Sequence, residues 1–475
     1  MGSPQGGTVS ESSWVHPTHD DPTVAALSES VGGPMGQRAG RHPWWSPVRV
    51  LLVLTALTFA AGMLAKAPCA ADEWQDNTLR YTHMCYSDLP FLYGLRGMAD
   101  LHWPYTDDAE VRAEFEVMEY PAGISYWAWG TGVVTWALSG APDVDDPARD
   151  MPREGTLYVA VNAVGFALVA LLTTWFMAGV TRRRPWDAAG FALAPALAVT
   201  GIMNWDLLAV VFVAGAAWAW AKDRPVLTGV LIGVGTAVKL YPLFLLGAVL
   251  VICLRGRRWT ALAGAFLGAA VAWLLANAPA LLTGPEQWKV FWSFNSDRGA
   301  DLGSVWLMVQ QMMGPGTWID VGLINDGSWA FFLLWCVGVL VLGLKAPQSP
   351  RFAQLGFLIL AGFLLVNKVY SPQYVLWLLP LAVLAHPRWR DLLIWQAGEI
   401  FYFAAVWWWL GGLLDPAQGE YSVIYWAAIA LRIAAQLWLV AMVVRGVLDP
   451  DEDPVGGRDP AVESALVDAR PATQK

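Results

Sequence analysis

Long apolar runs recur over most of this 475-residue chain and restrict its fold more than any other feature. Hydrophobic residues make up 56% of the sequence and charged residues only 15%, which is far from the composition of a water-soluble domain. A helix needs about 20 apolar residues to cross a hydrocarbon core of roughly 30 Å. Because backbone groups inside a bilayer must bond internally, we expect an all-α polytopic membrane protein with about ten to twelve membrane helices.

The two ends of the chain differ from this apolar region. Residues 1–47 are rich in glycine, serine, proline and acidic residues, and the acidic segment 448–475 is similar, so we expect two disordered tails. Residues 48–447 form the expected membrane domain. The net charge is −9, but the acidic residues are concentrated in the tails and polar loops, so a nucleic-acid partner is not indicated.

Basic residues set the expected orientation. Arg38, Arg41 and Arg49 precede the first apolar span, residues 50–64, and the positive-inside rule then keeps the amino terminus in the cytoplasm. Later basic clusters alternate with cation-poor turns. The expected cytoplasmic turns contain Arg182 to Arg184, Lys222 and Arg224, Arg255 to Arg258, Lys345 and Arg351, and Arg388 and Arg390. The expected outer turns are 204–206, 239–242, 279–328, 367–373 and 411–420. This pattern predicts a multi-pass plasma-membrane protein with both termini in the cytoplasm and a first outer loop at residues 67–121.

Two regions do not fit a simple alternation. Residues 121–138 and 158–180 are both hydrophobic, but two full crossings would leave Arg182 to Arg184 outside. Either the first of these segments is re-entrant or the charge rule fails here. Residues 225–254 are too few for two ordinary spans and too many for one. Because this segment has Lys-Leu-Tyr-Pro at its centre and cations at both ends, we expect a hairpin of two short helices that reaches only part way into the membrane.

The four cysteines do not have the spacing of a metal site. Cys69 and Cys85 share the first outer loop and could form a disulfide if that loop faces an oxidising compartment. Cys253 and Cys336 lie in apolar spans, where we expect inert packing residues.

The first outer loop carries the densest polar chemistry. Asp88 precedes a short apolar run, residues 89–95, and could be either a helix cap or a catalytic base. Arg96 lies two helical turns further on, where it could pair with Asp88 or bind an anion. Tyr105 and the pair Glu119-Tyr120 lie in rigid turns beside prolines, where aromatic residues are also common for structural reasons.

Two further turns place polar residues beside apolar spans. Asn204 and Asp206 join two spans, and an exposed helix cap is the favoured interpretation of Asp206. Lys239 has long apolar runs on both sides and, with Tyr241, suits an anionic lipid head group. Snorkelling of the lysine to the interface is the equally weighted alternative.

A last outer turn repeats this chemistry with Lys368, Tyr370, Gln373 and Tyr374. Two lysines at membrane depth on the same side favour a phosphate ligand. The sequence contains no Walker loop, dinucleotide fingerprint, zinc spacing or Gly-x-Ser-x-Gly elbow, so we expect no cofactor and no metal.

Several motifs occur in an order and spacing that resemble a known family. They are SDLPFLYGLRG at residues 87–97, a Pro-Tyr pair at 104–105, MEYP at 118–121, IMNWDLLAV at 202–210, GVGTAVKLYPLFLL at 233–246, VYSPQYVLWLLPL at 369–381 and DLLIWQAGEIFYFAAVWWWLGG at 391–412. Together they resemble glycosyltransferase family 87, a group of actinobacterial membrane proteins of the GT-C superfamily that are similar to polyprenol-phosphate-mannose-dependent mannosyltransferases. The resemblance extends over nearly the whole membrane domain.

The resemblance implies a GT-C-like fold in which an acid of the first outer loop is the catalytic base. The matching residue is Asp88, with Glu119 as a second candidate for the base or for a sugar contact. It also implies inverting transfer of a hexose, with mannose expected, from a polyprenyl-phosphate donor to a lipid or glycan acceptor on the outer face. Lys239 and Lys368 would stabilise the leaving phosphate, assisted by Arg96. The expected substrate-binding residues are Arg96, Tyr105, Glu119, Tyr120, Asn204, Asp206, Lys239, Tyr241, Lys368, Tyr370, Gln373 and Tyr374.

Two other functions are compatible with parts of the pattern. Intramembrane lysines and broken helices also fit a flippase or transporter of lipid-linked sugars. No inverted repeat is visible, and the polar residues collect on one side, which favours an enzyme. A catalytically silent membrane scaffold is the third hypothesis.

Overall fold

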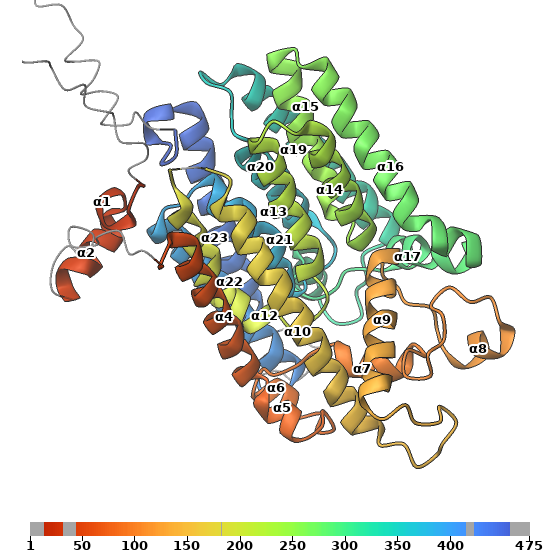
Figure 1. The fold of residues 1–475 in the computed structure, drawn as a ribbon. Coiled ribbons are helices and arrows are strands. Elements are labelled where there is room, and N and C mark those ends of the chain that lie inside the picture. Colours follow the sequence, from red (N-terminus) through yellow and green to blue (C-terminus); the bar gives the residue numbers. More distant parts are fainter. Residues whose placement is uncertain (1–13, 32–43, 182, 415–421, 457–475) are drawn as a thin grey trace, which may run out of the picture.

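The computed structural model describes residues 14–31, 44–181, 183–414 and 422–456. All regular elements in these ranges are helices, and the long ones stand side by side in a bundle (Figure 1). The expectation of an all-α polytopic fold is therefore confirmed for the described part of the chain.

Five helices in the described ranges are long and apolar enough to cross a membrane. They are α4 (Pro47–Ala65), α10 (Met151–Ala178), α16 (Trp259–Thr283), α19 (Val321–Lys345) and α23 (Val423–Leu448). Shorter apolar helices complete the bundle. They are α13 (Leu207–Ala221), α14 (Pro225–Val238), α15 (Leu245–Gly256) after the turn η2 (Tyr241–Phe244), α20 (Phe352–Val366), and α21 (Val375–Ala385) after the turn η3 (Pro372–Tyr374). With α22 (Trp389–Leu410), which packs along α23, this set agrees with the ten to twelve membrane helices expected.

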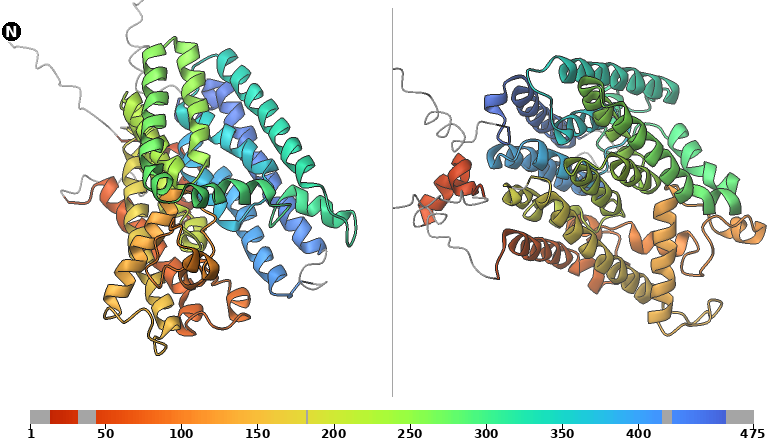
Figure 2. Two further views of the ribbon diagram at one scale, coloured as in Figure 1. Left: turned by 90° about the vertical axis from the view of Figure 1, so that its right-hand side faces the viewer. Right: turned by 45° about the horizontal axis from the view of Figure 1, so that its top comes forward.

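Shorter helices gather at one end of the bundle, which we call the loop end and define by residues 66–121 (Figure 1; Figure 2, left). They are α5 (Ala67–Ala71), α6 (Leu79–Thr82), α7 (Leu89–Leu95) and α8 (Ala109–Glu114). Three further helices lie at the loop end: α9 (Ala122–Leu138), α17 (Pro285–Asp297) and α18 (Val305–Met312). This end contains the expected first outer loop.

The opposite end of the bundle, the basic end, collects the arginines of the expected cytoplasmic turns. Arg255 donates to the carbonyl of Ala346 at 2.7 Å, and Arg351 forms an ion pair with Asp453 at 2.7 Å. From this end η1 (Pro185–Ala188), α11 (Ala189–Ala192) and α12 (Pro195–Thr200) lead back into the bundle. The basic residues and the cation-poor turns thus lie at opposite ends, as the alternation predicts.

The first irregular region has a simple explanation in the structure. Arg149, just before α10, forms an ion pair with Asp100 of the first loop at 2.8 Å, so α9 begins and ends at the loop end. Only α10 continues to the basic end, where the Val15 amide donates to the Arg183 carbonyl at 2.7 Å. Within the bundle, α9 therefore does not run from one end to the other, as a re-entrant segment would not.

The second irregular region is the hairpin expected over residues 225–254. Arg258, after α15, forms an ion pair with Asp223, before α14, so both ends of the segment meet at the basic end. The helix breaks at Lys239, whose backbone is extended, and η2 follows. The predicted hairpin is confirmed, and it carries Lys239 to its tip.

Small residues let the hairpin pack closely against α16. Gly229 and Gly233 of α14 are four residues apart and face the backbone of Ala265 and Ala269. A methyl group added at either glycine would collide with the facing carbonyl oxygen. This is the close backbone approach that small residues at this spacing permit in membrane helices.

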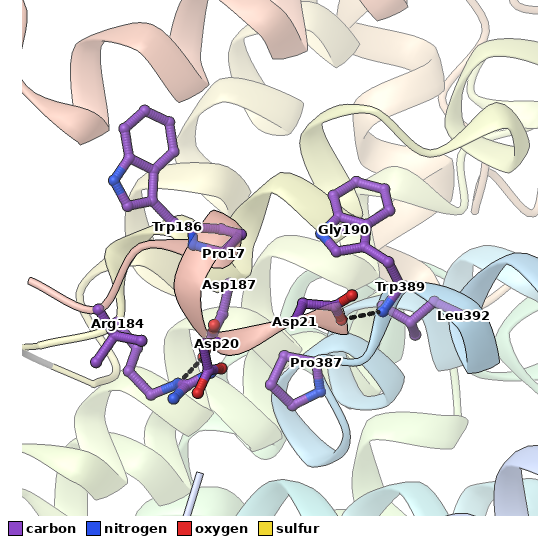
Figure 3. A pocket seen from close by; sticks show the side chains of 11 residues that line it. Pro17, Asp20, Asp21, Arg184, Trp186, Asp187, Gly190, Pro387, Trp389 and Leu392 are labelled. Carbon is purple, nitrogen blue, oxygen red and sulfur yellow. Dashed lines mark hydrogen bonds and ion pairs between the residues drawn. The ribbon is translucent and has the colours of Figure 1, made fainter. Parts of the chain in front are cut away.

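The prediction of a disordered amino-terminal tail is wrong for residues 14–31. Residues 14–31 were expected to be disordered, but they form α1 (Pro17–Asp20) and α2 (Pro22–Val31) (Figure 1). Figure 3 shows Asp20 and Asp21 beside Arg184 and Trp389 at the basic end. Asp20 forms an ion pair with Arg184 at 2.5 Å, and the Trp389 amide donates to Asp21 at 2.9 Å. Composition alone could not reveal these partners, because they lie far away in the sequence.

The carboxyl-terminal tail is also partly ordered. The turn η4 (Pro450–Glu452) follows α23, and Asp453 is held by Arg351, so the expected disorder is wrong for residues 449–456. The remaining predictions for the tails, and parts of two expected turns, fall outside the described residues. These positions are 1–13, 32–43 with Arg38 and Arg41, Arg182, 415–421 and 457–475.

Candidate active site

A cavity of about 580 Å³ opens among the elements of the loop end. Its lining comes from the first loop, the hairpin tip, α17 with the segment after it, α19, the turn before α21, and the end of α22. Eight residues singled out in the sequence line it: Asp88, Glu119, Tyr120, Lys239, Tyr241, Lys368, Gln373 and Tyr374. The cavity therefore brings together polar groups from motifs that are far apart in the chain.

Asp88 precedes α7 but does not cap it, because its carboxylate makes no bond to the helix amides. Instead Oδ1 accepts a hydrogen bond from the Tyr86 hydroxyl at 2.7 Å, and Oδ2 accepts one from Asn204 at 2.6 Å. The Asp88 amide donates to the Met203 carbonyl at 2.8 Å, which fixes the backbone. The helix-cap interpretation of Asp88 is thus wrong, and its carboxylate faces the cavity.

The surroundings of Asp88 make it a stronger base than an exposed aspartate. Burial raises the pKa of Asp88, while hydrogen bonds from Asn204 and Tyr86 and the charge of Lys239 partly oppose this rise. Burial and the Asp88 charge also raise the pKa of the Tyr86 hydroxyl, so it stays protonated and donates. A carboxylate with a raised pKa is suited to accept a proton.

Asn204 links the first loop to the turn before α13. Its Nδ2 lies 2.6 Å from Asp88 Oδ2 and 2.7 Å from the Tyr120 hydroxyl, while its Oδ1 accepts from the Trp205 amide at 2.6 Å. Asn204 is itself buried. One amide therefore holds both the carboxylate and a tyrosine of the cavity.

Lys239 and Asp206 form a buried ion pair beside this amide. Lys239 Nζ lies 3.3 Å from Asp206 Oδ1 and 4.6 Å from the centre of the Tyr120 ring. Trp377 Nε1 donates to the same Asp206 oxygen at 2.6 Å. Two interpretations are therefore wrong: Asp206 is not an exposed cap, since its exposed fraction is 0%, and Lys239 does not snorkel to a surface.

Lys368 and Arg298 add two more cations to the cavity lining. Lys368 Nζ donates to Asn325 Oδ1 at 2.7 Å and to the Ser296 carbonyl at 3.2 Å. Partial burial and the nearby Arg298 charge lower the pKa of Lys368. Arg298 Nε donates to Asp301 at 3.0 Å. With Lys239, the cavity therefore has three cationic side chains, which is suitable chemistry for an anionic group.

In the described residues, no group of three histidine, cysteine, aspartate or glutamate side chains could share a metal ion. The cavity chemistry is that of one buried carboxylate and several cations. Residues 151–367 match the model of glycosyltransferase family 87. The chain contains a glycosyltransferase family 87 domain. A search of curated proteins found no match.

The family 87 match, together with the apolar helices, identifies the chain as a membrane glycosyltransferase. The matched residues contain Asn204, Asp206, Lys239 and Arg298, while Asp88 lies before them in the first loop. The cavity joins both parts. The contacts of Asp88 with Asn204 therefore connect the first loop to the family 87 domain.

Five residues expected to bind substrate lie outside the cavity lining: Arg96, Tyr105, Asn204, Asp206 and Tyr370. Of these, Asn204 and Asp206 contact the lining residues Asp88 and Lys239, as described above. Arg96 does not pair with Asp88. It pairs with Glu119 at 3.0 Å and Glu116 at 2.9 Å, so it holds Glu119 at the cavity edge. The buried Tyr105 hydroxyl bonds to Ser125 at 3.2 Å. The buried Tyr370 hydroxyl donates to Glu399 in α22 at 3.0 Å.

Other residues that line the cavity were missed in the sequence. Tyr81, Tyr86 and Trp407 form an aromatic wall, with ring centres of Tyr86 and Trp407 4.9 Å apart and those of Tyr81 and Tyr86 6.4 Å apart. Arg298 was also missed. Its signal was that it is a cation within an expected outer turn, whereas the basic residues otherwise cluster in the expected cytoplasmic turns. For Tyr86 the available signal was its position next to Cys85, and for Trp407 its place in the motif at 391–412.

A disulfide between Cys69 and Cys85 supports the aromatic wall, which confirms the suggested pairing. Their Cα atoms are 5.8 Å apart. Lys66 Nζ donates to the Tyr86 carbonyl at 2.8 Å. Burial lowers the pKa of Lys66 to about 7, and the Asp88 charge partly opposes this change. The segment that presents Tyr86 to Asp88 is thus fixed on both sides.

Proposed function

We propose that the enzyme transfers a hexose, mannose in the simplest case, from a polyprenyl-phosphate donor to a lipid or glycan acceptor. The observation that carries this proposal is that the Asp88 carboxylate and three cations line one cavity. A base and a phosphate site are the two groups that such a transfer needs. The reaction inverts the configuration of the transferred sugar, and no metal takes part in the proposed step.

Asp88 is the base in this mechanism. It takes the proton of the acceptor hydroxyl as the oxygen attacks the anomeric carbon from the side opposite the phosphate. The bond between that carbon and the phosphate oxygen breaks, and its electron pair remains on the phosphate. Glu119 is the less suitable base, because its carboxylate is held in an ion pair with Arg96.

Lys239, Lys368 and Arg298 stabilise the charge that grows on the leaving phosphate. Apolar rings at the same cavity, among them Phe291, Trp329 and Phe332, suit the prenyl chain. Lipid-linked substrates reach such a site from the surrounding membrane. Membrane lipids are therefore the third expected partner.

Two features support an outward-facing cavity in the plasma membrane. The arginines of the basic end, including Arg184 and Arg351, favour the cytoplasm by the positive-inside rule, which also places both termini there. The disulfide between Cys69 and Cys85 lies at the loop end and suits an oxidising compartment.

The test uses the full chain in nanodiscs with labelled polyprenyl-phosphate mannose and a lipid extract as acceptor. Asp88→Asn should lower transfer by about 100-fold or more, since it removes a general base. Asp107→Asn, at an exposed acid of the same loop, is the matched control and should transfer normally. Full transfer by Asp88→Asn would remove Asp88 from the mechanism. Absence of transfer from any donor by the wild type would favour the transporter or scaffold hypothesis.

A further inference from the structure

Two segments that carry cavity cations are joined behind the cavity. We call residues 298–304 and 367–374 together the double loop. Arg298 lies on the first segment and Lys368 on the second, and both line the cavity. The position of these two charges therefore depends on what holds the double loop together.

Backbone hydrogen bonds connect the two segments directly. The Asp301 amide donates to the Lys368 carbonyl at 2.8 Å, and the Tyr370 amide donates to the Leu302 carbonyl at 2.6 Å. These bonds place Lys368 beside the segment that carries Arg298. The double loop is thus one hydrogen-bonded unit.

A buried charged network lies behind the double loop. The Tyr370 hydroxyl lies 3.0 Å from each carboxylate oxygen of Glu399 in α22. The guanidinium carbon of Arg432 in α23 lies 3.5 Å from the centre of the Tyr370 ring. Glu399 is 3% exposed and Arg432 is 0% exposed. Tyr370 is therefore held between an acid and a base that lie on neighbouring helices.

The same network also forms hydrogen bonds with Gly303 in the other segment of the double loop. Arg432 donates to the Gly303 carbonyl at 3.3 Å, and the Gly303 amide donates to the Tyr425 hydroxyl at 2.9 Å. The Tyr402 hydroxyl donates to the Tyr370 carbonyl at 2.6 Å. Gly303 has φ +66°, and an added Cβ would collide with the Tyr402 hydroxyl. Only glycine fits this position without displacing the double loop.

Charged side chains inside a membrane bundle are costly, so they indicate a functional role by default. A network of neutral groups could join α22 and α23 at lower cost. Here the charges instead act on Tyr370 and Gly303, one in each segment of the double loop. Glu399, Arg432 and Tyr370 do not line the cavity, so they act through the residues that do.

We propose that Tyr370, Glu399 and Arg432 are positioning residues that fix the double loop so that Arg298 and Lys368 meet the donor phosphate together. This inference rests on the proposed function and extends it, because it assigns donor recognition to the double loop. Tyr370 thereby has a role that differs from the direct substrate contact expected in the sequence. Acceptor recognition, on the side of Asp88, is separate from this network.

The first test compares Tyr370→Phe with Tyr158→Phe. Both changes remove one buried hydroxyl, but Tyr158 bonds to the Ala128 carbonyl in a part of the bundle away from the double loop. Tyr370→Phe should raise the donor KM about tenfold, and kcat and the acceptor KM should change by less than about twofold. Tyr158→Phe should leave both KM values unchanged. A purely structural role for Tyr370 would lower the amount of active enzyme without changing the donor KM.

A second test changes the backbone of the double loop instead of the Tyr370 side chain. Gly303→Ala should displace the double loop, whereas Gly338→Ala, at a helical glycine with open space around it, is its matched control. Binding of decaprenyl phosphate to the full chain in nanodiscs is measured without any reaction, with decaprenol as the phosphate-free probe. Gly303→Ala should weaken decaprenyl phosphate binding about tenfold and leave decaprenol binding unchanged.

The outcomes separate this inference from the proposed function. Unchanged donor KM and unchanged decaprenyl phosphate binding in folded Tyr370→Phe and Gly303→Ala would overturn the inference while transfer itself stands. If the wild type transfers no sugar but these variants bind decaprenyl phosphate more weakly than it does, the role of the double loop in phosphate binding is supported and the proposed transfer is rejected. A wild type that binds decaprenol and decaprenyl phosphate equally would also overturn the inference.

Discussion

The side-chain amide of Asn204 lies 2.6 Å from the carboxylate of Asp88, although 116 positions separate them in the chain. This contact joins the first loop to the family 87 domain. The same Asn204 nitrogen lies 2.7 Å from the Tyr120 hydroxyl, and the Lys239 ammonium lies 4.6 Å from the centre of the Tyr120 ring. The proposed base, Asp88, and the Tyr120 ring against which Lys239 lies are therefore connected through a single buried amide.

Replacing Asn204 by leucine should slow transfer and change its pH dependence. The hydrogen bond from Asn204 lowers the pKa of Asp88, so its loss should raise that pKa further above the ordinary value. A base acts only when ionised, so the acidic limb of kcat/KM should move to higher pH, and kcat should fall about tenfold or more. The measurement is kcat/KM between about pH 5 and pH 9. The exposed Asn77→Ala is the control. An acidic limb at the wild-type position would show that Asn204 does not tune Asp88.

Lys66 should make stability depend on pH above neutrality. Its pKa is about 7 in the folded protein, against an ordinary value of 10.5. Between these values the unfolded chain binds the proton and the folded chain does not, so stability should rise as pH increases from about 7 to 10.5. The melting temperature of the wild type, relative to that of Lys66→Met, should increase across this window. Parallel melting curves at every pH would contradict the assignment.

Removing the disulfide should affect both stability and transfer. The double change Cys69→Ser and Cys85→Ser opens a loop whose ends are 16 positions apart, which should cost about 3 kcal/mol. Because Tyr86 follows Cys85 and donates to Asp88, transfer should also fall. Thermal unfolding and transfer are measured with and without a reducing agent. Cys336→Ser is the control, and a reducing agent that changes the wild type and the double variant equally would exclude this role.

The sequence predicted the features that depend on local composition. Apolar runs and basic clusters predicted the spans, the two ends of the bundle and the hairpin tip at Lys239. It could not predict contacts that form only when distant segments meet, such as Trp407 against Tyr86 or Arg298 beside Lys368. For the same reason, the ion pair of Asp206 with Lys239 was mistaken for an exposed cap, since a polar residue before a helix is ordinarily solvated.

The buried pair of Lys239 with Asp206 allows stability and catalysis to be separated. Asp206→Asn alone leaves an uncompensated buried lysine and should cost about 3 to 5 kcal/mol of stability. Lys239→Met alone leaves the aspartate unpaired and should cost a similar amount. The double variant Asp206→Asn with Lys239→Met contains neither charge, so most of the lost stability should return.

Transfer by this double variant should remain about 100-fold or more below the wild type, because the leaving phosphate lacks its lysine. Melting temperatures of the single and double variants are compared with transfer rates on the same preparations. Lys289→Met, which breaks an exposed pair with Glu286, is the matched control and should change stability by less than about 1 kcal/mol. If the double variant recovers transfer together with stability, Lys239 serves only to neutralise Asp206 and has no part in phosphate binding.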